Sequence, residues 1–159
     1  MPASLSYVKR KLQEEVLEQW KKSWHKLKEK ERGAYYNSNV QGEPRITLKV
    51  EKLAALKRTF AAYSQLKLGK GFFKSFSKAI GKDRNGKCFG SCQALQTPKH
   101  LILQCKHYRI EREKMKRRLG QQLTLAKLFN TTRGQQALRA YLLETQIATA
   151  KWLFAAGAL

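Results

Sequence analysis

Apolar residues recur at every third or fourth position over much of the chain, which is the spacing of amphipathic α-helices. The first such run covers residues 5–30, and its opposite face mixes lysine with glutamate, as a solvated face does. Trp20 and Trp24 fall on the apolar side. We expect both indoles in the core, although tryptophans can also stack on unpaired bases. The pattern predicts a long amphipathic helix near the start of the chain.

Glycines, prolines and short polar residues divide the rest of the chain. Residues 33–45 have the composition of a loop, and we expect a boundary there. Gly69 and Gly71 interrupt the next helical pattern, and Gly120 is placed to end a later one. The helices expected after the loop cover 46–68, 72–80, 106–119, 122–129 and, starting from a cap at Asn130-Thr131-Thr132, a last segment that reaches Trp152.

All three cysteines fall into one short stretch with a histidine among them, in the order C-x3-C-x7-H-x4-C. Three thiolates and one imidazole are the usual ligands of a closed, tetrahedral structural zinc site. Gly90 allows the sharp turn that would present the first two thiolates together. The alternatives are that the cysteines are ordinary buried thiols and that His107 is the imidazole ligand. The predicted ligands are Cys88, Cys92, His100 and Cys105.

Positive charge is concentrated around this stretch. The chain has 33 lysines and arginines against 11 acidic residues, a formal net charge of +22. Residues 51–120 hold 18 basic and 4 acidic side chains, whereas from residue 121 onward there are 4 basic and 1 acidic. So large an excess indicates a polyanionic partner, with nucleic acid ahead of an anionic membrane surface. The middle of the chain is the expected binding surface.

Two groups of basic residues in this middle region are candidates for phosphate contacts. The first would form a ridge if the backbone stayed helical across Gly69 and Gly71; the alternative is a solvated face. The second follows the last cysteine and can serve as a phosphate clamp, a nuclear-import signal or only an exposed helical face. Phe89 and Tyr108 are candidates for stacking on bases. The candidate nucleic-acid ligands are Lys67, Lys70, Lys74, Lys78, Arg109, Arg112, Lys116, Arg117 and Arg118.

The residues that the sequence lacks disfavour catalysis and membrane attachment. Asp83 is the only aspartate, so a centre of clustered aspartates and two metal ions cannot form. Three cysteines do not fit a secreted disulfide scaffold, which favours a reducing, intracellular compartment, nuclear or cytoplasmic. No signal peptide and no apolar run of membrane-spanning length is expected. We therefore expect a non-enzymatic protein without a membrane anchor.

The residues on both sides of the cysteines add a resemblance to a known family. The order Arg58, Ser64-Gln65-Leu66-Lys67-Leu68-Gly69-Lys70-Gly71, the Cys/His stretch, Tyr108 and Arg112 resembles the carboxy-terminal end of a non-LTR (LINE-type) retrotransposon polyprotein. In that family the segment lies downstream of the reverse transcriptase and carries a CCHC zinc knuckle. The resemblance covers about residues 45–152. It implies zinc on the same four ligands and RNA or DNA on the flanking basic helices.

The chain departs from the family pattern at a few positions. Gln96-Thr97 stands where the family often has Glu-Thr, and Lys67 where an arginine is common. Neither departure removes a ligand. The chain also begins at Met1 without a polymerase or nuclease part, so we expect a truncated or domesticated fragment, and the family's activities are not carried over.

The sequence thus predicts a mainly α protein, a small helical domain with a zinc-knuckle loop between helices. Its expected parts are 1–44, an amphipathic helix and loop; 45–120, basic helices with the knuckle at 88–105; and 121–159, carboxy-terminal helices. We expect steeply salt-dependent binding to single-stranded RNA or DNA. The alternative is a protein-interaction module, such as an effector that acts on a host protein. A membrane-surface basic helix is a third possibility.

Overall fold

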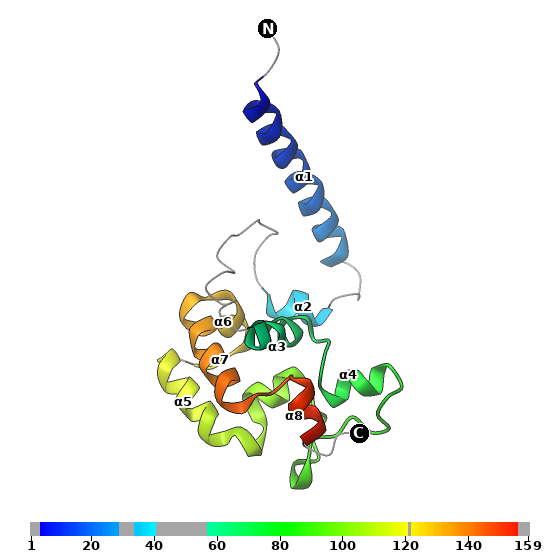
Figure 1. Cartoon of the computed structure of the whole chain (residues 1–159), viewed down its shortest axis with the longest axis vertical. Helices are drawn as coiled ribbons and strands as arrows, with labels where there is room; N and C mark the ends of the chain where they lie inside the picture. Colours follow the sequence, from blue (N-terminus) through cyan, green and yellow to red (C-terminus); the bar gives the residue numbers. More distant parts are fainter. Residues whose placement is uncertain (1–3, 29–33, 41–56, 121, 156–159) are drawn as a thin grey trace.

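The computed structural model describes residues 4–28, 34–40, 57–120 and 122–155. Helices dominate these ranges and none of the residues in them belongs to a strand, which confirms the mainly α class. One isolated β-bridge pairs Lys87 with Leu95. The α-helices (Figure 1) are α1 (Leu5–Lys28), α2 (Ala34–Asn39), α3 (Lys57–Leu68), α4 (Lys74–Ala79), α5 (Arg109–Leu119), α6 (Leu125–Asn130), α7 (Thr132–Thr145) and α8 (Ala150–Ala155).

The core forms where α7 packs against α5, α6 and α3. Helix α7 repeats apolar residues at three- and four-residue intervals, and Leu138, Tyr141 and Leu142 on this stripe are buried. Tyr63 of α3 donates a hydrogen bond from its hydroxyl to the carbonyl of Phe129 (3.2 Å), and the two rings meet edge to face. These contacts join α3, α6 and α7. The segment that carries the three cysteines and His100, residues 88–105, is called the cysteine loop. It lies between α4 and α5, at the edge of this core.

Local signals in the sequence correctly mark several helix ends and turns. Thr131 caps α7, because its hydroxyl accepts a hydrogen bond from the N–H of Gly134 (3.0 Å). Gly120 ends α5 with a positive φ of 69°. Asp83 starts the turn before the cysteines by accepting a hydrogen bond from the N–H of Gly86 (2.6 Å). The helix end expected at Gly120 and the cap expected at Asn130-Thr131-Thr132 are confirmed.

The loop expected over residues 33–45 is wrong for its first part, where α2 forms. The Tyr35 hydroxyl donates a hydrogen bond to the carbonyl of Leu66 in α3 (3.0 Å). The Asn130 side chain donates to the carbonyl of Asn39 (3.0 Å). These tertiary contacts with α3 and α6 hold a segment whose composition alone resembles a loop. Residues 41–45 lie outside the described part, and the domain boundary at residue 44 stays a prediction.

The last expected helix is divided in two. Helix α7 ends at Thr145 and α8 begins at Ala150. Between them Gln146 (φ 55°) and Ala148 (φ 58°) adopt the left-handed conformation, which stops a right-handed helix. Helix α6 also starts later than expected, at Leu125, because Thr124 provides its cap.

The backbone does not stay helical between α3 and α4, so a single basic ridge does not form. Gly69 has a φ of 72° and Gly71 a φ of 150°. The Gln65 side chain holds this turn by accepting a hydrogen bond from the N–H of Phe72 (2.8 Å). Lys67 therefore lies on α3, and Lys74 and Lys78 lie on the separate helix α4. A helix was expected over residues 46–68. Residues 46–56 lie outside the described part, and α3 accounts for the rest.

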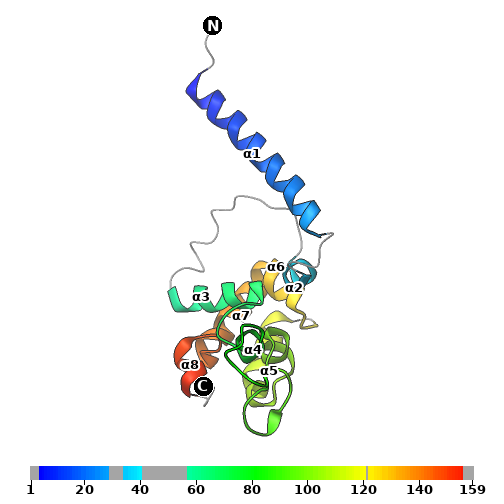
Figure 2. The ribbon, with the colours of Figure 1, turned by 90° about the vertical axis from the view of Figure 1, so that its right-hand side faces the viewer.

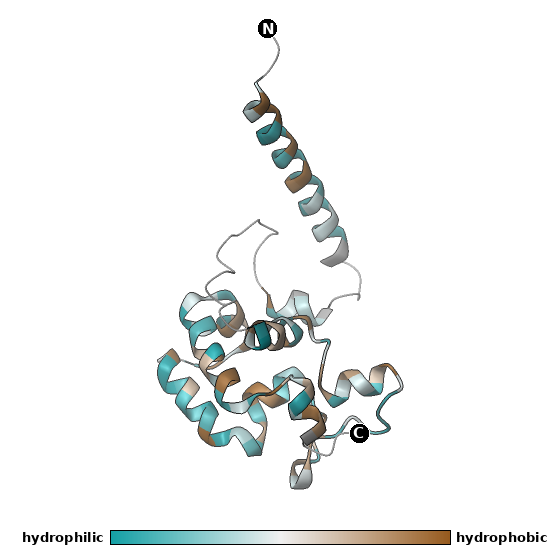
Figure 3. Cartoon of the chain, viewed as in Figure 1, coloured by the Kyte–Doolittle hydropathy of each residue, from teal (hydrophilic) through white to brown (hydrophobic). Residues whose placement is uncertain are grey.

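Helix α1 confirms the long helix expected at the start of the chain, but its apolar stripe is not in the core. Figures 1 and 2 show α1 extending away from the other helices, and Figure 3 shows hydrophobic positions along it. Trp20 is 46% exposed, so its placement in the core was wrong. Trp24 is half-buried and meets the ring of Tyr36 edge to face at 5.3 Å. The exposed stripe consists of Leu5, Val8, Leu12, Val16 and Trp20.

Candidate metal centre

A short hairpin-like turn positions the first two cysteines. The Cys88 N–H donates a hydrogen bond to the carbonyl of Ala94 (2.8 Å), and the Gln96 N–H donates to the carbonyl of Gly86 (2.9 Å). Between these pairings the chain reverses through one 3-10 turn, Gly90–Cys92. Gly90 has a φ of 52°, which a residue without a side chain adopts readily. The turn brings the side chains of the first and second cysteines to one side.

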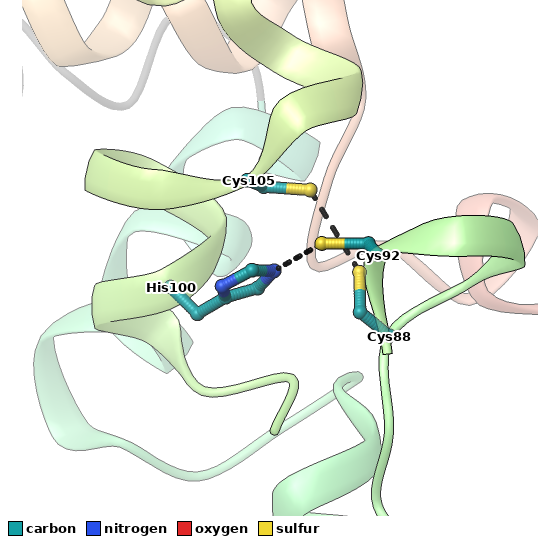
Figure 4. Close-up of side chains that lie close together, drawn as sticks. All are labelled: Cys88, Cys92, His100 and Cys105. Carbon is teal, nitrogen blue, oxygen red and sulfur yellow. Dashed lines mark hydrogen bonds between the residues drawn. The ribbon is translucent and has the colours of Figure 1, made fainter. Parts of the chain in front are cut away.

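A π-helical turn, His100–Gln104, positions the other two side chains. The His100 N–H donates to the Thr97 hydroxyl (3.1 Å) at its start, and the Cys105 N–H donates to the carbonyl of His100 (2.8 Å) at its end. A π-helical turn is closed by a hydrogen bond between residues five positions apart, whereas an α-helical turn joins residues four apart. Such π-turns are frequent at functional sites. Figure 4 shows His100 and Cys105 pointing toward the first two cysteines.

The four predicted ligands meet at one point. Their ligand atoms all lie within 4.8 Å of one another. The Sγ atoms of Cys88 and Cys105 are 3.7 Å apart, and Cys92 Sγ lies 3.3 Å from Nε2 of His100 (Figure 4). A disulfide would need about 2.05 Å between sulfurs, so the cysteines are free thiols. The cluster is compatible with a bound metal ion.

The cluster is largely shielded from water. Cys88, His100 and Cys105 are buried, and Cys92 is partly exposed. Burial raises the pKa of Cys88, and it raises the pKa of Cys105 to about 12. Burial also acts on Cys92, but the backbone N–H groups of Lys106 and Ala94 outweigh it and lower the pKa of this thiol. Burial, with Arg112 and His107 nearby, lowers the pKa of His100, which favours the neutral imidazole that a metal requires.

Three side chains outside the ligand set fix the loops that carry the ligands. Gln96 is fully buried; its oxygen accepts a hydrogen bond from the N–H of Lys74 (2.8 Å), and its nitrogen lies 3.9 Å from the Cys88 sulfur. The Arg112 guanidinium donates to the carbonyl of Cys105 (2.8 Å). The Tyr141 hydroxyl donates to the carbonyl of Leu101 (2.8 Å) in the π-turn. Helices α4, α5 and α7 are thereby joined to the cluster.

The alternative imidazole, His107, lies outside the cluster. It is exposed, and its Nε2 is 3.0 Å from the carbonyl oxygen of Phe89, to which the ring N–H donates. His107 therefore connects the two halves of the site at their surface, whereas His100 belongs to the group of potential ligands.

The two aromatic residues considered for base stacking make internal contacts. The Phe89 ring meets Trp152 of α8 edge to face at 5.5 Å, and the Lys74 ammonium lies 5.0 Å from its centroid. The Tyr108 hydroxyl accepts a hydrogen bond from the Trp152 indole (2.6 Å). Both residues are half-buried. Their observed contacts fix α8 against the cysteine loop.

The structure places the predicted basic ligands in different settings. Lys67 is half-buried between the rings of Tyr36 and Tyr63, and burial lowers its pKa. Lys74 and Arg112 contact the cysteine loop as described above. Arg118 lies 3.7 Å from the carboxylate of Glu144. The remaining candidates are exposed: Lys70, Lys78, Arg109, Lys116 and Arg117.

Comparisons with protein-family models, curated proteins and solved structures find no match. The likeness to a retrotransposon carboxy terminus therefore stays an expectation carried by the residues quoted for it. None of the described helices is long and apolar enough to cross a membrane.

Sequence reasoning missed the supporting roles of Gln96, Tyr141 and Trp152. A glutamine in a loop gives no periodic signal, so nothing in the pattern marks Gln96 as buried. Tyr141 and Trp152 do fall on the apolar spacing of the last segment, which predicts burial. Buried Tyr and Trp need polar partners, and that rule is the signal that points to their hydrogen bonds.

Proposed function

We propose that the cluster binds one structural zinc ion. With a Zn–S distance of about 2.3 Å and a Zn–N distance of about 2.05 Å, tetrahedral angles put two sulfurs about 3.8 Å apart, and sulfur and nitrogen about 3.6 Å apart. The Cys88–Cys105 and Cys92–His100 separations of 3.7 Å and 3.3 Å are close to those values. All four donors come from this chain, which fits a closed structural site with no position left for a substrate.

Metal analysis of the purified, reduced protein tests this proposal. We expect one zinc per chain, lost in His100→Ala and retained in the matched variant His107→Ala. A protein that contains no metal while keeping its full helicity would refute the zinc site. Loss of zinc in His107→Ala alone would show that the wrong histidine has been assigned.

We further propose that the protein binds single-stranded RNA or DNA and does not catalyse a reaction. The observation that supports this proposal is the positive charge around the cysteine loop, which acidic side chains do not neutralise. Of the nine predicted ligands, Arg118 alone forms an ion pair with an acidic residue in the described part of the chain. Phosphates are the natural partners of the five other exposed ones, because each contact releases a condensed counterion; these are Lys70, Lys78, Arg109, Lys116 and Arg117. The zinc would fix the loop between α4 and α5, and the retrotransposon resemblance agrees with this role.

The salt dependence of oligonucleotide binding tests the second proposal. For a single strand, each phosphate contact adds about 0.7 to the slope of log affinity against log salt. Lys116→Gln/Arg117→Gln should lower the slope by about 1.4 if both side chains contact phosphate. The control Lys9→Gln/Arg10→Gln removes the same charges from α1 and should change the slope less. An affinity indifferent to salt would overturn the proposal.

One observation favours a second candidate function, protein interaction through α1. Its exposed stripe of Leu5, Val8, Leu12, Val16 and Trp20 is a hydrophobic surface of the kind found at interfaces. Partner binding that survives nuclease and high salt, and is lost in Leu12→Ser/Val16→Ser, would favour this function over nucleic-acid binding.

A further inference from the structure

A pocket lies beside the part of α3 that carries Arg58, Ala61 and Gln65. It has a volume of ≈ 360 Å³ and is lined by α3, the turn after it, the segment between α7 and α8, and the start of α8. That volume falls in the range of about 300–1,000 Å³ typical of small-molecule sites. Neither the cysteine cluster nor the predicted phosphate ligands line it. Its lining residues are Arg58, Ala61, Gln65, Phe72, Gln146, Ala148, Thr149, Ala150 and Lys151.

The chemistry of this pocket combines positive charge with an aromatic face. Arg58 and Lys151 are exposed cations, and no acidic residue lines the pocket. Phe72 is 42% exposed, whereas the next residue in the chain, Phe73, is fully buried. An exposed phenylalanine beside two cations can stack on a base while the cations bind the adjacent phosphate. The amides of Gln65 and Gln146 supply hydrogen-bonding groups at the same place.

The walls of the pocket are held in defined positions. The side-chain oxygen of Gln65 accepts a hydrogen bond from the N–H of Phe72 (2.8 Å). The side-chain nitrogen of Gln65 is therefore the atom that can donate to a ligand. A side chain at Gly71 would collide with Gln65, and Gly71 itself has a φ of 150°. On the other wall, Gln146 and Ala148 are two of the three non-glycine residues with positive φ in the described part of the chain. Such strained backbone concentrates at ligand sites.

We propose that this pocket binds one unpaired nucleotide within a single strand. The phosphate lies between Arg58 and Lys151, and the base stacks on Phe72. The inference rests on the proposed nucleic-acid binding and makes it more specific: most contacts follow the phosphates, whereas this pocket makes affinity depend on the presence of a base. A neighbouring cavity of ≈ 390 Å³ shares Arg58 and Gln146 and adds Lys57, so the strand can continue along the start of α3.

Binding of a ten-nucleotide oligouridylate and of a matched abasic strand to this 159-residue chain, in the presence of zinc, tests the proposal. One base stacked on an aromatic ring is worth about 5- to 150-fold in affinity, so the wild-type protein should prefer oligouridylate by such a factor. Phe72→Leu should lose most of this preference and keep the salt slope. The control is Phe154→Leu, which changes an exposed phenylalanine outside the pocket and should keep the preference.

The possible outcomes separate this inference from the proposed function. Equal preference in Phe72→Leu, Phe154→Leu and wild type would overturn the pocket and leave nucleic-acid binding intact; no binding of either strand by the wild type would overturn both. Micromolar competition by uridine monophosphate would assign the pocket to free nucleotides and contradict the proposal. If Phe72→Leu fails to fold, the variant Arg58→Gln, at an exposed position, tests the pocket instead. The slope of log affinity against log salt should fall by about 0.7 in this variant, and an unchanged slope would overturn the pocket.

Discussion

The side chain of Gln96 joins the cysteine cluster to α4. It is 0% exposed, and its two polar atoms face the Lys74 N–H and the Cys88 sulfur. A buried polar group is stable only when its partners are in place, and an unpaired buried N–H costs about 1–3 kcal/mol. Gln96 therefore contributes to the shape of the cysteine cluster, although it is not one of the four predicted ligands.

Replacing Gln96 with leucine should destabilise the protein by about 1–3 kcal/mol, because the Lys74 N–H loses its acceptor without a change in overall bulk. Chemical denaturation in the presence of zinc measures the change. Gln104→Leu is the control: Gln104 is an exposed glutamine in the π-turn, and its replacement should cost less than about 0.5 kcal/mol. Equal costs in the two variants would contradict the role given to Gln96.

The hydroxyl of Tyr63 predicts a pH effect with a defined sign. Burial raises its pKa to about 12 in the folded protein, against about 10 in the unfolded chain. Below pH 10 the phenol is neutral in both states, and Tyr63→Phe should cost about 1 kcal/mol through the lost hydrogen bond to Phe129. Between pH 10 and 12 the unfolded wild type ionises first. The wild type then loses stability relative to the variant by about 1.4 kcal/mol per pH unit.

Denaturation of both proteins at about pH 8 and about pH 11 measures this effect. The difference between wild type and Tyr63→Phe isolates one phenol, because every other titrating group is common to both chains. The advantage of the wild type should vanish or reverse at the higher pH. A difference that stays constant would mean that Tyr63 is not held in a buried, neutral state.

At the scale of elements, the break between α7 and α8 gives a test of backbone strain. Ala148 is buried with a φ of 58°, a conformation that costs an L-residue about 1–2 kcal/mol. Ala148→Gly relieves that cost while it loses a buried methyl of about 0.8 kcal/mol and gains freedom in the unfolded chain. The opposing effects nearly cancel, so we expect a change below about 0.5 kcal/mol.

The matched control is Ala137→Gly within α7. Ala137 is equally buried but helical, so its variant loses the methyl and also about 1 kcal/mol of helix propensity. Thermal or chemical unfolding should show a loss of about 2 kcal/mol for this variant. Equal losses at the two positions would show that the segment between α7 and α8 is not strained.

Elements that depend on local chemistry could be predicted from the sequence, and elements that depend on tertiary contacts could not. Thr131, Gly120 and Asp83 act on their own neighbours, so their caps and turns are visible in the chain. The spacing of Cys88, Cys92, His100 and Cys105 likewise predicted that these four side chains come together. Helix α2 and the break before α8 were missed, because contacts with α3 and α6 stabilise the first and no glycine marks the second.

At the scale of the whole molecule, α1 is an amphipathic helix whose apolar face does not pack against the core. Its residues have the three- and four-residue spacing of a helix that covers a core, yet Leu12 is 55% and Val16 61% exposed. Spacing reports only that a helix has an apolar face, and it does not say which surface covers that face. The one ring contact from α1 to the rest of the described chain joins Trp24 to Tyr36.

Hydrophobic residues of α1 should therefore contribute little to the stability of the remaining helices. Leu12→Ala leaves a good helix former at an exposed position and should change the free energy of unfolding by less than about 0.5 kcal/mol. Leu128→Ala in α6 removes a side chain with no exposed surface and should cost about 2–5 kcal/mol. Near-UV circular dichroism during denaturation follows the core in both variants. A loss in Leu12→Ala comparable to that in Leu128→Ala would mean that the stripe is covered in solution, which joins this test to the candidate interaction through α1.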